Sequence, residues 1–427
     1  MTTVGGKTRR VVARGSAQFS KLRPEHISVQ IIDGKYNLST GAAPETSVFV
    51  RVRADLNAIK SQFDKYNENE ATRRLWGMFQ NAIDLYKELR FHVAATFNAQ
   101  ATTNAWLKYH EIIIEHELIA TRGPLHRAFF NAEFPGGFVA AHNHYMKTER
   151  RSRTFEWRAS SLMEGLATGN DVALGDKYGL YAQNRDNWMM NEANNGDATS
   201  AANIRDWAAR IGPKSSYGGV DLYSHDAGMD VSDDYNNQES TNAKLHLGCA
   251  LAGFATMKIG ACFIAKQYTI FETLSWNLIL IYANLFDEFR LCKPLTSRPY
   301  NSEIYLIGKG FRGIDDTLFE QLIARLDTPH ARLIDARADD PAVISVREFC
   351  DKMFGQQTQF LQENLALMQQ YGTSRESIHR LQDLTRPTHQ ACQRDWIKAY
   401  PVEFLPYNDW LPALKKGAAE MLFGNAD

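Results

Sequence analysis

Four residues of two complementary types, Lys108, Asp226, Lys266 and Glu303, stand in segments that could each deliver a side chain to one cleft. Burial and a nearby cation both disfavour the ammonium form of a lysine, and a neutral lysine can take a proton from a hydroxyl group. Acidic neighbours would orient the amines but would also raise the pKa of Lys266, so the sequence leaves its protonation state open. Taken singly, such residues are more typical of the protein surface. Their occurrence together at strand ends favours a catalytic group.

The segments that must position these side chains alternate between strand and helix, most regularly over 219–308. The pattern predicts a strand ending at Asp226, a helix over 237–256, a strand ending at Lys266 and a helix over 270–286. Two more strands follow, with the sequences FRLCK and EIYLIG. Alternation of this kind predicts a mostly parallel sheet between helices, with ligands at the carboxyl ends of the strands. The last two strands are joined by too few residues for a helical crossover, so the last strand is predicted to be antiparallel.

The predicted sheet starts upstream of this region, with strands over 128–134 and 155–159 and a helix over 139–147. Helical periodicity before the first strand predicts helices from about Thr72 and over 101–118. The fold class is therefore predicted to be α/β and Rossmann-like.

The chain is predicted to have three parts: an N-terminal extension over 1–70, the α/β domain over 71–312 and a helical C-terminal appendage over 313–427. Short strands are expected over 26–32 and 47–52. The appendage is predicted to contain several helices, one of them opened by a capping box from Thr373 to Glu376 and the last carrying Lys415 and Lys416. The first 24 residues form either a mobile basic arm or a solvated tail, and their basic residues are Lys7, Arg9, Arg10, Arg14, Lys21 and Arg23.

Length and composition limit the possible classes of protein. The chain has 427 residues with 44% hydrophobic content, enough for a sizeable core, and its net charge of −1 gives no bulk attraction to nucleic acid. Its 5 cysteines lack a CxxC spacing, which indicates neither a disulfide framework nor a zinc site, so we expect no bound metal. The start of the chain lacks the apolar core of a signal peptide, and the most apolar run, 245–265, includes His246 and Lys258. These features predict a cytoplasmic protein without a membrane span.

A glycine-rich turn, Glu133-Phe-Pro-Gly-Gly-Phe138, follows a predicted strand and opens a predicted helix. Glycines in such a turn let the backbone come close to a bulky ligand while helix N–H groups face it. The turn resembles the S-adenosylmethionine loop of the FtsJ/RrmJ-like RNA ribose 2′-O-methyltransferases.

Five further segments strengthen this resemblance over about 95–310. They are similar to the family's S-R-A-x-x-K helix, its G-D-x-T and D-x-G motifs, its strand-borne lysine and its K-P-x-x-S-R-x-x-N-S-E block. In this chain they read Thr103-Asn-Ala-Trp-Leu-Lys108, Asn195-Gly-Asp-Ala-Thr199, His225-Asp-Ala-Gly228, Phe263-Ile-Ala-Lys266 and Lys293-Pro-Leu-Thr-Ser-Arg-Pro-Tyr-Asn-Ser-Glu303. The order Lys, Asp, Lys, Glu is that of the family's catalytic tetrad. Asn104 departs from the family's arginine, and the chain looks most like the cap-type enzymes of large cytoplasmic DNA viruses.

The resemblance implies an S-adenosylmethionine-dependent enzyme that methylates the ribose 2′-oxygen of RNA, most specifically the first nucleotide of capped mRNA. It implies Lys266 as the base, assisted by Lys108, Asp226 and Glu303. Capping or transcription proteins are expected as further partners, in the host cytoplasm or a virion. The implied cofactor-binding residues are Glu133, Pro135, Gly136, Gly137, Phe138 and Asp197. Arg298, Asn301 and Ser302 suit contact with an RNA backbone, although a turn satisfied by its own side chains is as compatible with the sequence.

Several alternatives remain open on the sequence. The substrate could be ribosomal or transfer RNA, or the protein could be a catalytically weak RNA-binding subunit of a capping complex. The run GKGFRG over 308–313, followed by Asp335, fits a dinucleotide-binding pattern. His142 and His144 could be a metal pair, but their spacing on a predicted helix favours a solvated or capping role. Four tryptophans could stack on a cap or belong to the core, namely Trp106, Trp157, Trp188 and Trp207.

Overall fold

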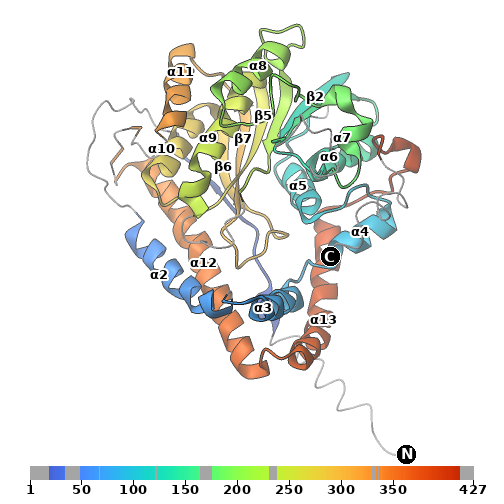
Figure 1. The fold of residues 1–427 in the computed structure, drawn as a ribbon, viewed down its shortest axis with the longest axis vertical. Helices are drawn as coiled ribbons and strands as arrows, with labels where there is room; N and C mark the ends of the chain where they lie inside the picture. The colour runs from blue at the N-terminus through green and yellow to red at the C-terminus, as the bar shows by residue number, and fades with distance from the viewer. Residues whose placement is uncertain are drawn as a thin grey trace, which may run out of the picture.

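A seven-stranded sheet lies at the centre of the molecule, with strand order β1-β6-β7-β5-β4-β2-β3 (Figure 1). The computed structural model describes residues 19–33, 49–66, 68–120, 123–163, 176–229, 238–328, 333–334, 336–337 and 339–413. The strands are β1 (Ile27–Gln30), β2 (Leu125–Asn131), β3 (Thr154–Ser160), β4 (Val220–His225), β5 (Met257–Gln267), β6 (Phe286–Lys293) and β7 (Ile304–Phe311).

Strand direction sets where the sheet can bind a ligand. Neighbouring strands are parallel from β3 through β2 and β4 to β5, whereas β7 is antiparallel to both β5 and β6. The predicted antiparallel last strand is thus confirmed. β2 and β4 are buried along almost their whole length, as expected for strands covered on both faces. Because β2, β4 and β5 are parallel, the residues at their carboxyl ends meet at one edge of the sheet.

Helices cover both faces of this sheet, which confirms the predicted Rossmann-like α/β class (Figure 1). On one face α5 (Asn104–Glu115) packs against α6 (Gly137–Glu149). On the other face α9 (Gln238–Thr256) contacts β4 and β5 and also packs against α8 (Ala201–Ile211), while α10 (Thr273–Asn284) contacts β6. Within the described part of the chain, no helix has the length and apolar character that crossing a membrane requires.

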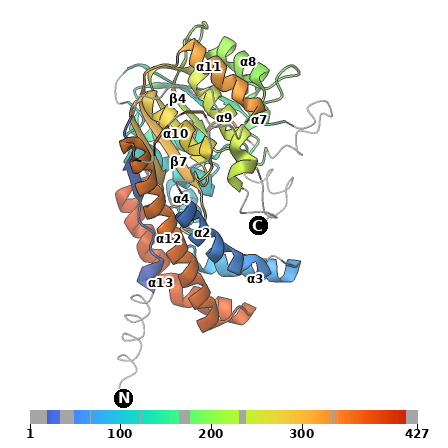
Figure 2. The same cartoon turned by 90° about the vertical axis from the view of Figure 1, so that its left-hand side faces the viewer.

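The N-terminal and C-terminal segments pack on each other. α12 (Pro341–Tyr371) packs against α2 (Val50–Lys60), and α13 (Arg375–Ala399) packs against α3 (Glu70–Ile83) (Figure 2). β1 also joins the central sheet by pairing with β6. The three predicted parts of the chain therefore interlock in space. The remaining elements are η1 (Phe19–Leu22), η2 (Ser61–Tyr66), α4 (Leu89–Phe97), α7 (Leu180–Gln183), η5 (Arg185–Asn187), α11 (Asp316–Ala324), η7 (Arg325–Asp327) and η8 (Tyr407–Asp409).

Two predicted features at the ends of the chain are wrong. The strand expected over 47–52 is replaced from Val50 onward by helix α2, whose buried residues Leu56 and Ile59 are three positions apart, as on one face of a helix. α13 is capped by the Ser374 side chain, which accepts a hydrogen bond from the Ser377 N–H group, and not by Thr373. Lys415, Lys416 and the first 18 residues lie outside the described part of the chain.

The glycine pattern over 308–313 does not form a dinucleotide-binding turn. Gly308 and Gly310 lie inside β7. A Cβ atom on Gly308 would lie 2.6 Å from the Phe286 ring, so this glycine allows β7 to pack closely on β6. Asp335 lies outside the described residues. The strand–turn–helix geometry that a dinucleotide-binding site requires is absent at 308–313.

Candidate active site

The four predicted catalytic residues come from four elements that meet at the carboxyl end of the sheet. Lys108 lies on α5, and Asp226 directly follows β4. Lys266 lies near the end of β5, and Glu303 immediately precedes β7. α5 begins where the Thr103 hydroxyl accepts a hydrogen bond from the Trp106 N–H group, which sets the position of Lys108 one turn later.

The tetrad forms two ion pairs. Lys108 Nζ lies 2.7 Å from Glu303 Oε1, and Lys266 Nζ lies 3.4 Å from Asp226 Oδ1. The lysine side chains are only 12% and 11% exposed, so both amines are largely withdrawn from solvent. The structure therefore brings the predicted residues together as two neighbouring pairs.

Tyr305 on β7 connects the two pairs. It lies opposite Lys266 in the antiparallel ladder between β5 and β7, and its hydroxyl donates a hydrogen bond of 3.0 Å to Asp226 Oδ1. Glu303 stands two residues earlier on the same strand and accepts a 2.9 Å hydrogen bond from the Ser297 hydroxyl. The register of β7 thus holds both carboxylates. The sequence analysis missed Tyr305 and Ser297, although Ser297 lies inside the block that ends at Glu303.

The charges of the site favour the ionised forms of Lys266 and Glu303. Burial alone would lower the pKa of Lys266, but Asp226, Tyr268 and Glu303 outweigh it and the net pKa is raised. Burial raises the pKa of Glu303, but Lys108, Lys266 and Lys293 lower it to about 2. The condition under which Lys266 would act directly as a base, a lowered pKa, is therefore not met in this structure.

A fifth charged residue, Lys293, supports the loop that carries Glu303. It is buried, and its amine donates hydrogen bonds to the backbone oxygens of Asn301 at 2.9 Å and Glu303 at 2.8 Å. Burial lowers the pKa of Lys293 to about 7, with Lys108 and Lys60 acting in the same direction against Glu303. Lys293 therefore positions Glu303. The sequence offered a signal for this residue, because Lys293 begins the family-like block that ends at Glu303.

The glycine-rich turn lies at the carboxyl end of β2 and opens α6. Gly136 has a φ of 107°, a conformation that favours glycine. A Cβ atom there would lie 2.3 Å from the Leu180 side chain, and one on Gly137 would lie 2.6 Å from the Thr103 hydroxyl. The space that these glycines leave is therefore used by α7 and by the start of α5.

Glu133 acts as the cap of α6. Its carboxylate accepts a 2.8 Å hydrogen bond from the Val139 N–H group, and it is 3% exposed. Burial raises the pKa of Glu133, and Asp226 adds to this effect. Part of the helix N-terminus that the sequence predicted to face a ligand is thus already paired with the protein's own acid.

Asp197 occupies a tight turn beyond β3. One of its oxygens accepts hydrogen bonds from the N–H group and the hydroxyl of Thr199, both at 2.8 Å. Gly196 precedes it with a φ of 81°, and a Cβ atom there would meet the backbone oxygen of Ser161. The turn is therefore held against the end of β3, on the same edge of the sheet as Glu133 and Asp226.

This edge of the sheet carries acidic side chains and closely packed glycines. Asp197 and Asp226 are partly exposed acids at the strand ends, and Pro135 in the turn is also partly exposed. Gly228 packs closely on the site, because a Cβ atom there would lie 2.3 Å from the Tyr268 hydroxyl and 3.2 Å from the Lys266 amine. Partly exposed acids are suited to a positively charged ligand. The cofactor contacts of the individual residues stay a prediction.

The three residues predicted to contact RNA are largely used within the protein. Arg298 forms an ion pair with Asp84 at 3.2 Å and is 34% exposed. Asn301 bonds to Lys293. Ser302 is 5% exposed and accepts a hydrogen bond from Lys60 at 2.9 Å. These contacts match a turn satisfied by its own side chains, in which Arg298 and Asn301 stay partly exposed.

The other candidate residues belong to the core. His142 and His144 are fully buried, so the predicted solvated role is wrong. His142 bonds to the Tyr109 hydroxyl at 2.7 Å, and His144 to the backbone oxygen of Glu403 at 2.8 Å. All four tryptophans considered for stacking are at most 5% exposed, which confirms the core interpretation for Trp106, Trp157, Trp188 and Trp207.

Comparisons with known proteins identify the domain. The family model for the FtsJ-like methyltransferases matches residues 101–311. The African swine fever virus protein named "Probable methyltransferase EP424R" is 40% identical over 267 residues, which cover 60% of this chain and 61% of the viral protein. "Cap-specific mRNA (nucleoside-2′-O-)-methyltransferase 2" of Mus musculus is 25% identical over 332 residues, covering 75% of this chain and 42% of the mouse protein.

A solved structure of a Plasmodium falciparum protein designated a ribosomal RNA methyltransferase is 14% identical, with a TM-score of 0.34, and the alignment covers 50% of this chain and 99% of that one. The chain spans 61% of the viral relative's length. The matched region contains all four tetrad residues and the glycine-rich turn. The chain therefore carries an FtsJ-like methyltransferase domain over residues 101–311.

Proposed function

We propose that this protein transfers a methyl group from S-adenosylmethionine to the ribose 2′-oxygen of RNA, and that its substrate is the first transcribed nucleotide of capped mRNA. The observation that carries the proposal is the pair of adjoining ion pairs, Lys108 with Glu303 and Lys266 with Asp226, at the carboxyl end of the sheet. The similarity to a protein named as a cap-specific methyltransferase supports the mRNA cap as substrate. The cytoplasmic setting predicted from the sequence belongs to the same proposal.

In this proposal Lys266 accepts the proton of the 2′-hydroxyl. Asp226 orients its amine and is itself fixed by the Tyr305 hydroxyl at 3.0 Å. Lys108 and Ser297 hold Glu303 in place, at 2.7 Å and 2.9 Å. The bound cofactor supplies the methyl group on a sulfonium centre, whose positive charge opposes the ammonium form of a nearby lysine. Since the ligand-free site favours that form, proton removal depends on the neutral fraction of Lys266.

The roles of the binding residues follow from their positions at the strand ends. We assign the cofactor to the edge formed by the turn from Glu133 to Phe138 and by Asp197, with Asp226 between them and the lysines. Much of the rate would come from holding the 2′-oxygen in line with the methyl group. We assign Arg298 to an RNA phosphate, because its guanidinium is partly exposed at the loop that carries Glu303.

The test is methyl transfer from labelled S-adenosylmethionine to matched RNAs with and without a 7-methylguanosine cap. Lys266→Ala should reduce transfer at least about 100-fold, the usual contribution of a positioned acid or base. Lys258→Ala is the matched control, because Lys258 also links β5 to β4, through a 2.6 Å ion pair with Asp221 at the opposite end of the strand. Lys258→Ala should keep nearly the wild-type rate.

Each outcome separates the alternatives. Transfer that depends on the cap and is lost in Lys266→Ala supports the proposal. Equal labelling of capped and uncapped RNA moves the substrate to ribosomal or transfer RNA. A wild-type protein that binds RNA and transfers nothing is instead a binding subunit.

A further inference from the structure

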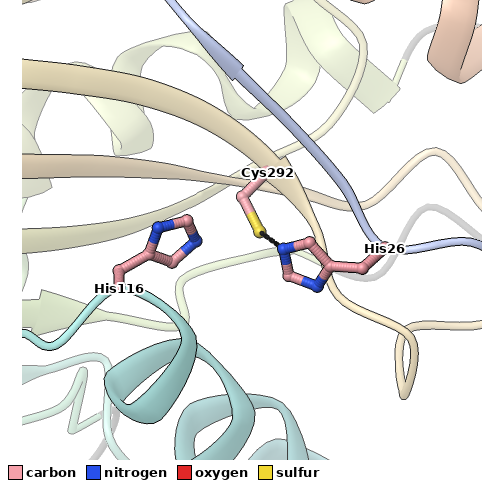
Figure 3. A group of neighbouring side chains, drawn as sticks. All are labelled: His26, His116 and Cys292. Carbon is pink, nitrogen blue, oxygen red and sulfur yellow. Dashed lines mark hydrogen bonds between the residues drawn. The ribbon is translucent and has the colours of Figure 1, made fainter.

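Three side chains with metal-binding atoms meet at a point that the methyl-transfer proposal does not use. His26 precedes β1, His116 follows the last turn of α5, and Cys292 lies on β6 (Figure 3). One donor atom from each lies within 4.8 Å of the other two. Figure 3 shows the two imidazole rings facing the sulfur from either side. These residues are far apart in the sequence, so no sequence motif predicted that they would meet.

The distances are close to those of a tetrahedral zinc site. His26 Nε2 lies 3.5 Å from Cys292 Sγ. A zinc ion with Zn–S of about 2.3 Å and Zn–N of about 2.0 Å separates its sulfur and nitrogen ligands by about 3.5 Å at the tetrahedral angle. The His116 donor atom lies within 4.8 Å of the other two, so zinc binding requires this ring to move closer to the sulfur.

Glu111 orients the first histidine as carboxylates do in zinc sites. Its Oε1 atom lies 3.1 Å from His26 Nδ1, which leaves Nε2 directed toward the sulfur. Glu111 is fully buried and is itself held by the N–H groups of Leu295 at 2.6 Å and Thr296 at 3.1 Å. An oriented imidazole with a buried carboxylate behind it is the arrangement that fixes a metal-binding nitrogen.

His116 provides an unsatisfied nitrogen at the same point. It is 8% exposed, and its Nε2 atom has no hydrogen-bond partner within the described part of the protein. A buried polar atom without a partner destabilises a fold. A metal ion between the two rings would use this nitrogen, and a thiolate with two imidazoles favours zinc over magnesium or calcium.

We propose that His26, His116 and Cys292 bind a zinc ion, which ties the N-terminal strand and the end of α5 to β6. Binding forms two Zn–N bonds and one Zn–S bond and releases the thiol proton of Cys292 to solvent. Water completes the fourth position, since the His26 side chain is 14% exposed and solvent reaches this side. Bound zinc would anchor the strand whose next residue, Lys293, supports Glu303. Zinc binding by these three residues does not require that the protein transfer methyl groups.

Cobalt(II) titration of the full-length, metal-stripped protein tests this site. Binding should give one equivalent of cobalt with a sulfur-to-cobalt charge-transfer band in the near ultraviolet and the intense visible bands of a tetrahedral ion, and zinc should abolish both. Cys292→Ser should lose the charge-transfer band. Cys350→Ser is the matched control, because Cys350 is also a fully buried free thiol, and should keep it.

A second variant covers the case in which Cys292→Ser does not fold. His116→Gln should weaken zinc binding at least about tenfold, and the same zinc concentration should raise its melting temperature less than that of the wild type. The proposal is overturned if the folded wild-type protein binds no cobalt, or binds it without the charge-transfer band. It is equally overturned if folded Cys292→Ser keeps the band.

Discussion

At the scale of the residue, the site is governed by charge pairs withdrawn from solvent. Burial disfavours the charged forms of Lys266 and Glu303, whereas their oppositely charged neighbours favour these forms. The neighbours outweigh burial in both cases. Each ion is therefore kept charged by its neighbour. Removing one member of a buried pair leaves the other charge without compensation. This change destabilises the protein far more than the same change in an exposed pair would.

Lys266→Arg distinguishes whether Lys266 accepts a proton or acts only as a fixed positive charge. Arginine keeps the positive charge beside Asp226 but cannot lose its proton in a protein. We expect kcat to fall about 100- to 10,000-fold, the range for a general base, while the melting temperature stays near that of the wild type. The measurements are single-turnover methyl transfer and thermal unfolding. A variant that keeps kcat within about tenfold would show that Lys266 acts only through its charge.

Glu303 makes stability depend on acid pH. Its pKa is about 2 in the folded protein and 4.5 ordinarily, because its lysine partners outweigh its burial. A lowered folded pKa contributes stability above the ordinary value, and this contribution is lost as the pH falls from 4.5 toward 2. This difference in pKa corresponds to about 3 kcal/mol in the free energy of unfolding.

Denaturant unfolding at about pH 6 and about pH 3 measures this effect. The free energy of unfolding of the wild type should fall more steeply between these values than that of Glu303→Gln, which cannot titrate at this position. Parallel declines in the two proteins would contradict the assigned pKa.

At the scale of the element, turns between strands and helices decide which side chains reach the site. The turn at Gly136 joins β2 to α6 in a left-handed conformation, and the loop from Lys293 to Glu303 joins β6 to β7. Both turns are held by protein contacts, through Leu180 in one case and through the Lys293 amine in the other.

Gly136→Ala should destabilise the protein by about 1–3 kcal/mol, because its φ of 107° is strained for alanine and its Cβ atom would lie 2.3 Å from Leu180. Cofactor affinity, measured by calorimetry, should weaken with it. Gly77→Ala is the matched control, since it lies in α3 with no atom within 4 Å of the new Cβ, and should stabilise by about 0.5–1 kcal/mol. Equal effects of the two changes would rule out the strain argument.

At the scale of the whole molecule, the C-terminal helix α12 supports the loop that carries Glu303. Gln357 on α12 is fully buried and donates hydrogen bonds to the backbone oxygen of Tyr300 at 2.9 Å and to Ser302 at 3.1 Å. Lys60 on α2 reaches the same serine. Segments from both ends of the chain therefore meet beneath the loop that ends at Glu303.

Gln357→Ala should reduce the free energy of unfolding by about 1–3 kcal/mol, because it leaves buried polar groups of the loop without partners. Methyl transfer should also slow, since the loop positions Glu303. Gln359→Ala provides the control, because Gln359 is exposed on the same helix. If Gln357→Ala loses stability but keeps the full rate, α12 supports the fold and not the site.

The sequence predicted the central elements well where periodicity and turn length were strong. The strand that ends at Lys266, the helix that follows it and the antiparallel last strand all matched the structure. The segment over 47–52 failed, because a short apolar run does not distinguish a strand from the start of a helix whose buried face emerges later.

The sequence by itself determined the order of elements and predicted the four tetrad residues, because residue types and motif spacings are local properties of the chain. Tertiary structure decided their electrostatics, since the raised pKa of Lys266 depends on acids that approach from other strands. It also decided that Ser302 is buried and that His26, His116 and Cys292 meet. These results depend on contacts between residues tens to hundreds of positions apart, which no local pattern encodes.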